Sequence, residues 1–129
     1  NGVHLKKEIN KCSLKGNRGL FQQVLINTLK NGIEAMPNGG ELTITCFQNY
    51  STIKITIKDE GIGMTEEQKN RLGEPYFSAK DVKGTGLGMM VVYRIVETMK
   101  GKVSVTSEKG KGTGITLLFP TINEKAINQ

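Results

Sequence analysis

Residues 25–35 read LINTLKNGIEA and lie inside a longer segment, Asn17–Met36, that has helical spacing throughout. Its apolar residues recur at intervals of three and four, which predicts a helix with one apolar stripe: Phe21, Leu25, Leu29, Ile33 and Met36. The sequence PNGG at 37–40 ends this helix. We therefore expect the segment to lay one face on a hydrophobic layer.

The same helix carries Asn27, Asn31 and Glu34. At 100° per residue these three side chains fall within about 60° of one another, opposite Leu25 and Leu29. A solvated polar face explains such a cluster. Asparagine is a mediocre helix former, however, and its side chain can ligate Mg²⁺ through oxygen while its amide donates to phosphate. The helix alone leaves both interpretations open.

Two segments show the alternation of apolar and other residues that is typical of β-hairpins. In the first, Leu42, Ile44 and Cys46 alternate with other residues, and after a turn at 48–51 so do Ile53, Ile55 and Ile57. The second joins Val103–Ser107 to Thr113–Phe119 through a turn at 109–112. A further short strand or leading segment is expected at Val3–Lys11.

Between the hairpins, Thr65-Glu66-Glu67-Gln68 has the pattern of a capping box and opens a short helix to Leu72. Gly73–Gly84 has no periodicity and is expected to be a loop. A second long helix runs from Gly86 to Lys100, and Gly101 ends it. The predicted fold is an α/β (α+β) two-layer sandwich, with a mixed sheet of about five strands covered on one face by three helices.

Two glycine-bearing loops could hold a ligand. Asp59-Glu60-Gly61-Ile62-Gly63 follows a strand, so its glycines would allow close approach of a flat ligand to a carboxylate, although a plain turn explains the pattern almost as well. Gly84–Gly88 opens the second long helix, where free amides favour an anion. It is neither a P-loop nor a dinucleotide fingerprint, and a structural turn is the alternative. Lys80 and Lys83 just upstream favour phosphate.

Composition excludes several function classes. The net charge is +6, but the lysines are spread along the chain and aromatic residues make up only 5%, which argues against nucleic-acid binding. Cys12 and Cys46 are too few for a disulfide scaffold or a zinc site, and we expect reduced thiols in a cytosolic protein. His4 is the single histidine and has no partner for catalysis.

Taken together, four segments resemble the boxes of the ATP-binding domain shared by histidine kinases, type II topoisomerases, Hsp90-type chaperones and MutL-type repair proteins, known as the Bergerat fold. The segments are Leu25–Ala35 (N box), Asp59–Gly63 (G1), Glu74–Lys80 (F) and Gly84–Gly88 (G2), with Gly112-Thr113-Gly114 at the closing position. The sequences of the F box and the N box resemble those of sensor histidine kinases. Residues 88–105, GMMVVYRIVETMKGKVSV, together with the N box resemble the sporulation and nitrogen-regulation branch. The sequence departs from the usual pattern at Gly32, where alanine is common.

The resemblance implies roles for individual residues. Asn31 and Asn27 would ligate Mg²⁺ and act as the catalytic residues, and Asp59 would accept a hydrogen bond from the adenine amino group. The implied ATP-binding set is Asn27, Asn31, Glu34, Asp59, Gly61, Gly63, Met64, Tyr76, Phe77, Lys80, Lys83, Gly84, Thr85, Gly86, Leu87, Gly88 and Thr113. Tyr76 and Phe77 would anchor a lid over the nucleotide.

The resemblance also implies an activity and partners. Residues 1–129 would be one catalytic domain, with a leading segment at 1–15 and a frayed tail at 121–129, that transfers the γ-phosphate of Mg-ATP to a histidine on a phosphoacceptor domain. No phosphoacceptor motif surrounds His4. The expected context is a response regulator and a homodimeric full-length kinase, with this domain in the cytosol and membrane attachment only through preceding regions. Two alternatives are an anti-sigma-type serine kinase and an interaction module of this fold that binds no nucleotide.

Overall fold

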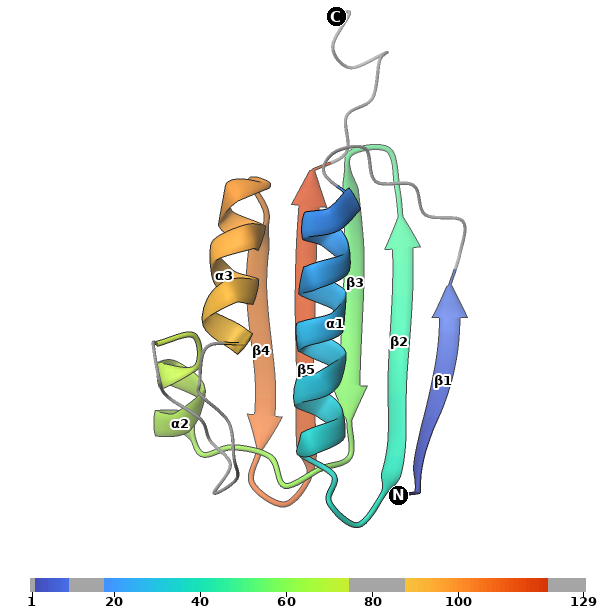
Figure 1. Ribbon diagram of the computed structural model, residues 1–129, viewed down its shortest axis with the longest axis vertical. Coiled ribbons are helices and arrows are strands. Elements are labelled where there is room, and N and C mark those ends of the chain that lie inside the picture. The colour runs from blue at the N-terminus through green and yellow to red at the C-terminus, as the bar shows by residue number, and fades with distance from the viewer. Residues whose placement is uncertain (1, 10–17, 75–87, 121–129) are drawn as a thin grey trace, which may run out of the picture.

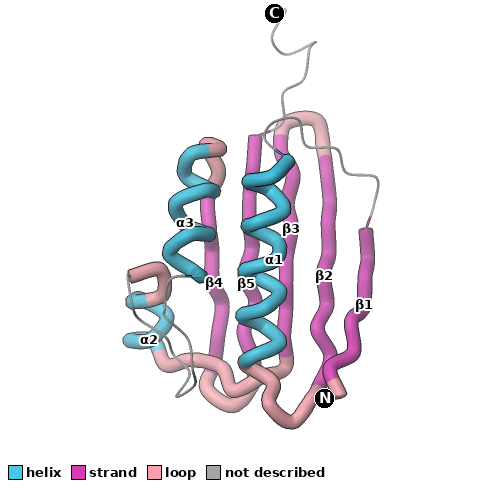
Figure 2. Tube along the Cα trace, viewed as in Figure 1, coloured by secondary structure: helices cyan, strands magenta, loops and turns pink. Residues whose placement is uncertain are grey.

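The computed structural model describes residues 2–9, 18–74 and 88–120. Within these ranges one mixed sheet has the strand order β1-β2-β3-β5-β4, and α1 and α3 lie over the same face of it (Figures 1 and 2). The elements are β1 (Val3–Ile9), α1 (Arg18–Glu34), β2 (Gly40–Gln48), β3 (Thr52–Asp59), α2 (Glu66–Arg71), α3 (Gly88–Thr98), β4 (Lys102–Glu108) and β5 (Gly112–Pro120). The predicted two-layer sandwich with a mixed sheet is confirmed.

The strand pairing follows from the connections. β1 and β2 pair in parallel, as strands joined through a helix can, and the remaining neighbours pair antiparallel. In the second hairpin, β5 pairs with β3, and β4 lies at the edge of the sheet. The leading segment is therefore a strand of the sheet over Val3–Ile9.

The core lies between the helices and the sheet. Alternate residues of β3 and β5 are buried against it, and the ring of Phe21 on α1 meets that of Phe119 edge-on, with 5.9 Å between centroids. The centre of the buried face of α1 is Val24 and Thr28, both with no exposed surface. The Thr28 hydroxyl donates to the Val24 carbonyl at 2.7 Å, so burial leaves it paired.

The predicted stripe on α1 is partly wrong. Ile33 is 38% exposed, while Asn27 and Asn31 are half-buried rather than on a fully solvated face. The buried face is instead centred on Val24 and Thr28, because the polar residue Thr28 takes a core position that the apolar pattern does not count. Gly32 also lies close to the sheet, where a Cβ would lie 2.7 Å from Leu42 Cδ1.

The short helix α2 begins as predicted. The Thr65 hydroxyl accepts from the Gln68 amide at 3.2 Å, and the Gln68 side chain accepts from the Thr65 amide at 2.9 Å. This completes a capping box, which satisfies two amides that the helix itself leaves unpaired. Contacts with β4 place α2 beside that strand, at the margin of the helical layer.

The end of α3 differs in detail from the prediction. Lys100, not Gly101, adopts the left-handed conformation, with φ 62°. The amides of Lys100 and Gly101 donate to Glu97 and Val96 at 2.9 and 2.8 Å, the two bonds of a Schellman motif. Gly101 is needed for another reason, because a Cβ there would overlap the carbonyl oxygen of Leu118.

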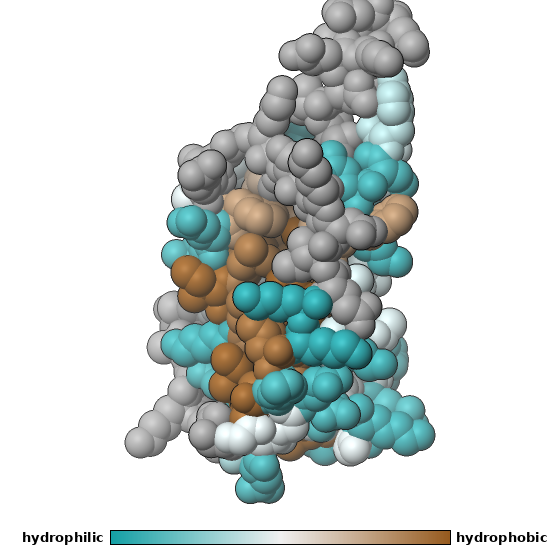
Figure 3. All heavy atoms as spheres, turned by 90° about the vertical axis from the view of Figure 1, so that its right-hand side faces the viewer, coloured by the Kyte–Doolittle hydropathy of each residue, from teal (hydrophilic) through white to brown (hydrophobic). Residues whose placement is uncertain are grey.

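The β1 side of the sheet extends beyond the helices. Figure 3, viewed from that side, shows a vertical band of apolar side chains flanked by polar ones. Leu5 on β1 is 44% exposed.

The prediction of reduced thiols is wrong for Cys46, which is disulfide-bonded, and Cys12 lies outside the described residues.

Candidate functional site

Asp59 ends β3 and continues the alternation that buries the three isoleucines of that strand. Its side chain is only 3% exposed. Oδ1 accepts hydrogen bonds from the backbone amides of Gly61 at 2.8 Å and Thr113 at 3.2 Å. Burying a carboxylate is costly unless it has such partners, so the backbone around Asp59 is arranged to hold it.

The register of the sheet places Asp59 in a row across four strands. Leu42 pairs with Asp59, Asp59 with Thr113, and Thr113 with Ser107. Above this row passes α1, since a Cβ at Gly32 would lie 3.7 Å from Asp59 Oδ2. The two predicted segments at 25–35 and 59–63 are therefore brought together.

The loop after Asp59 is packed against two other segments. A Cβ at Gly61 would overlap the Ala35 carbonyl oxygen, to which the Ile62 amide donates at 3.0 Å. On the other side, the Gly110 amide donates to the Ile62 carbonyl at 2.7 Å. The loop thus joins the end of α1 to the β4–β5 turn.

Glu60 is turned away from Asp59. Its Oε1 accepts from the Glu41 amide at 2.8 Å, at the start of β2. Its exposed carboxylate therefore helps to fasten the loop to the sheet, and Asp59 is the carboxylate of this segment that faces the helical layer.

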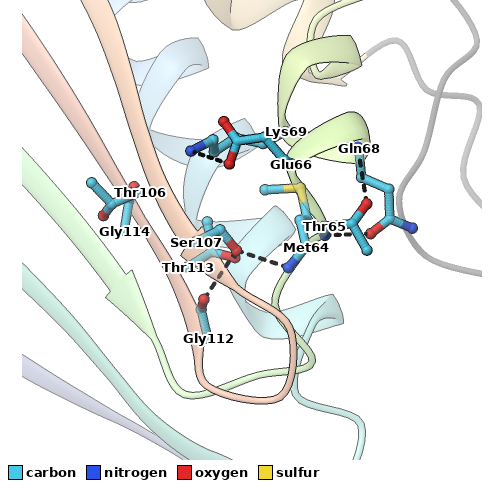
Figure 4. Close-up of polar contacts among 10 residues, drawn as sticks. All are labelled: Met64, Thr65, Glu66, Gln68, Lys69, Thr106, Ser107, Gly112, Thr113 and Gly114. Carbon is cyan, nitrogen blue, oxygen red and sulfur yellow. Dashed lines mark hydrogen bonds and ion pairs between the residues drawn. The ribbon is translucent and has the colours of Figure 1, made fainter.

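Met64 and Thr113 meet at Ser107. The Met64 amide donates to Ser107 Oγ at 2.8 Å, and the hydroxyls of Ser107 and Thr113 are 2.7 Å apart (Figure 4). Met64 and Thr113 are each 6% exposed. Both predicted residues therefore lie on the same side of the sheet as Asp59, and Ser107 is a residue of this site that the sequence interpretation missed.

Asn27 connects α1 to the first turn of α3. Its Nδ2 donates to the Gly88 carbonyl at 3.4 Å, and its Oδ1 accepts from Gln23 Nε2 at 3.0 Å. The last glycine of the predicted 84–88 loop thus lies beside the predicted asparagine. Asn31 and Glu34, both half-buried, follow on the same side of α1.

Part of the predicted site lies outside the described residues: Tyr76, Phe77, Lys80, Lys83, Gly84, Thr85, Gly86 and Leu87. Where that segment leaves the described chain, a Cβ at Gly73 would lie 2.6 Å from the ring of Tyr93 on α3. Burial raises the pKa of the Tyr93 hydroxyl, because it disfavours the charged phenolate.

A metal at this site would depend on the amides of α1. Among the described residues no group of three or more His, Cys, Asp or Glu side chains is placed to hold an ion. Asparagine oxygens are hard ligands suited to Mg²⁺, which commonly keeps several waters and takes further ligands from substrate phosphates. The side chains of Asn27 and Asn31 fit that chemistry.

Gly63 provides a test of how tightly the loop is held. It has φ +67°, and a Cβ would overlap the Glu108 carbonyl oxygen. We expect Gly63→Ala to lower the free energy of unfolding by about 2–5 kcal/mol, through left-handed strain and overpacking together. Urea denaturation of both proteins measures this difference in the free energy of unfolding.

Gly110→Ala is the matched control, because Gly110 has φ +85° but open space around it. Strain alone should cost about 1–2 kcal/mol there. Equal losses in the two variants would show that the contact with Glu108 does not constrain the loop.

Comparison with known proteins identifies the family. A family model for the histidine kinase-, DNA gyrase B-, and HSP90-like ATPases matches residues 16–123. Sporulation kinase E of Bacillus subtilis (strain 168) is 49% identical over 101 residues, which are 78% of this chain and 14% of that protein. Sporulation kinase C of the same organism is 42% identical over 114 residues, 88% of this chain and 26% of that protein. The chain thus spans about a quarter or less of these relatives.

Solved structures show the same fold. The mycobacterial sensor histidine kinase MprB superposes with a TM-score of 0.84 at 21% identity, covering 92% of this chain and 83% of that one. A nucleotide-free form of the catalytic domain of histidine kinase ThkA has a TM-score of 0.80 at 26% identity, covering 92% and 80%. These matches confirm the predicted Bergerat fold, and the chain belongs to the family of histidine kinase-, DNA gyrase B- and HSP90-like ATPases.

Proposed function

We propose that residues 1–129 form one catalytic domain that binds Mg-ATP and transfers the γ-phosphate to a histidine on a separate phosphoacceptor domain. The observation that carries the proposal is the buried Asp59 carboxylate beside Gly32 of α1, in a chain of this ATPase family. The names of the similar proteins, which are sporulation kinases and sensor histidine kinases, favour transfer to histidine. Residues 1–15 would lead into the domain, and 121–129 would be a frayed tail.

Asp59 would recognise the adenine. An ionised carboxylate is an acceptor only, so it favours a base that presents an amino group and disfavours guanine, which presents a carbonyl oxygen at the corresponding position. Gly61 and Gly63 would shape this pocket indirectly, since their lack of side chains lets the loop pack against the backbone of Ala35 and Glu108. Met64 and Thr113, both buried beside the same row of the sheet, would close the adenine end.

The phosphates would lie toward α3. Its first amides are unpaired by the helix and favour an anion, and Asn27 touches Gly88 at that end. Asn31 and Asn27 would ligate Mg²⁺, with Glu34 next to them on α1. When bound, Mg²⁺ neutralises charge on the phosphates and orients them. Residues outside the described ranges would complete the grip: Lys80, Lys83, Gly84, Thr85, Gly86 and Leu87, with Tyr76 and Phe77 anchoring the lid.

The residue at position 27 bears on the choice of reaction. A glutamate there could activate water for hydrolysis, whereas the neutral side chain of Asn27 is no general base. Phosphoryl transfer needs positioning and charge neutralisation more than a protein nucleophile, which the arrangement of α1 and α3 would supply. Asn27 therefore favours transfer to a protein side chain.

The proposed context is a two-component kinase. Its partners would be its own helical phosphoacceptor domain and a response regulator. The full-length kinase would be a homodimer that does not bind nucleic acid, with this domain in the cytosol. No helix among the described residues is long and apolar enough to cross a membrane. Membrane attachment would come only from regions preceding this sequence.

Asp59→Asn tests adenine recognition. The amide oxygen can still accept from Gly61 and Thr113, but its NH₂ group cannot accept from the adenine amino group. We expect the Kd for Mg-ATP, measured by calorimetry, to rise at least about tenfold, as for a buried polar group left unpaired.

Glu60→Gln is the matched control, because it neutralises the neighbouring carboxylate, which is bonded to Glu41. Its Kd should stay within about twofold of the parent, a difference well under 1 kcal/mol. An Asp59→Asn variant that binds as the parent does would contradict the adenine assignment. A parent chain that gives no heat with millimolar Mg-ATP would favour the interaction module.

Asn31→Asp tests the metal site. The added charge beside phosphate and the altered metal geometry should slow phosphotransfer to a supplied phosphoacceptor domain at least about a hundredfold. Asn38→Asp, the same change in an exposed turn, should leave the rate unchanged. Transfer at the parent rate by Asn31→Asp would show that the metal assignment is wrong.

The stability of the phosphorylated product separates the two kinase alternatives. Phosphohistidine is labile in acid and phosphoserine is not, so we expect the label on the acceptor protein to be lost in acid and kept in base. An acid-stable product would favour the anti-sigma-type serine kinase instead.

A further inference from the structure

The hydroxyl of Ser107 joins three segments of the chain. Its Oγ accepts from the Met64 amide at 2.8 Å, donates to the Gly112 carbonyl at 3.0 Å and lies 2.7 Å from Thr113 Oγ1 (Figure 4). Met64 follows the loop after β3, Gly112 and Thr113 begin β5, and Ser107 itself lies on β4. No role in the proposed function falls to Ser107.

Ser107 is placed to act on the adenine end of the site. It is paired with Thr113, which is paired with Asp59, so the three side chains follow one row of the sheet. Val103, Val105 and Ser107 are the residues of β4 that are half-buried, while their neighbours on the strand are exposed. The serine therefore faces the same layer as Asp59.

The single proton of Ser107 constrains its neighbours. A hydroxyl has one donor and two acceptor lone pairs. If the Ser107 proton goes to the Gly112 carbonyl, the Thr113 hydroxyl must donate to Ser107. The lone pairs of the Thr113 hydroxyl then remain available to a ligand. Removing the hydroxyl would free the Thr113 proton and leave the Met64 amide without its partner.

We propose that Ser107 is a positioning residue for the adenine of bound ATP. It holds the Met64 backbone amide and the Thr113 hydroxyl in fixed orientation near Asp59, which would meet the base. This inference rests on the proposed function. It differs from a purely structural role because it concerns the base and leaves the phosphate end alone.

The test measures the Kd values of full-chain variants for Mg-ATP and Mg-GTP by calorimetry. The Kd of the nucleotide that binds more weakly is obtained from its competition with the tighter one. Ser107→Ala should raise the Kd for Mg-ATP about tenfold and leave the Kd for Mg-GTP unchanged within twofold. The ratio of the two constants should therefore fall about tenfold. Ser107→Thr, which keeps the hydroxyl, should restore most of the affinity for ATP.

Thr106→Ala is the matched control. Thr106 precedes Ser107 on β4, is exposed, and contacts only the Gly114 carbonyl at 3.5 Å in the interactions drawn in Figure 4. Thr106→Ala should change neither the Kd for Mg-ATP nor the Kd for Mg-GTP by more than twofold. If Ser107→Ala unfolds at the temperature of measurement, Ser107→Cys in reducing buffer replaces it, because a thiol fills similar space but bonds weakly.

Two results would overturn the inference while leaving the proposed function in place. One is a Ser107→Ala variant that binds ATP within twofold of the parent. The other is an equal loss of affinity for ATP and GTP, which indicates general loosening of the fold. A parent chain that binds no ATP would instead overturn both proposals.

Discussion

The site depends on a buried carboxylate held by backbone amides. Asp59 is 3% exposed, and its Oδ1 takes two amide hydrogen bonds, one from its own loop and one from β5. Such a group is stable only where several segments meet in fixed positions, because an unpaired buried charge costs far more than one hydrogen bond returns. The sheet register, the loop after β3 and the path of α1 all satisfy that requirement.

Close backbone contacts fix those segments. Gly32 lets α1 pass over Leu42 and Asp59, Gly61 lets the loop touch the end of α1, and Gly63 lets it touch Glu108. At Gly61 and Gly63 a side chain would overlap a backbone carbonyl oxygen and separate two segments that now meet. Gly32 is the least constrained of the three, since the nearest atom a Cβ would meet is the Leu42 methyl group at 2.7 Å, which lies at the end of a flexible side chain.

Much of the fold could be predicted because its signals are local. The alternation of β3 and β5 and the capping box at Thr65 appear in the structure where the sequence places them. The face of α1 could not be predicted as well, since its buried centre includes Thr28, a polar residue that a pattern of apolar residues does not count. Ser107 was missed although a signal existed: Asp59, Thr113 and Ser107 all continue the buried alternation of a strand with a polar residue. The conformation of Lys100 has no comparable signal, because lysine seldom adopts positive φ.

The central claim is that the adenine of ATP binds against Asp59, between the loop after β3 and the start of β5. Amide chemical shifts recorded during a titration with adenosine, and then with Mg-ATP, test it most directly. The account predicts saturable shifts of the Gly61, Met64 and Thr113 amides with both ligands, and of residues at the start of α3 with Mg-ATP only. Saturation with Mg-ATP that leaves the Gly61 and Thr113 amides unmoved would contradict it.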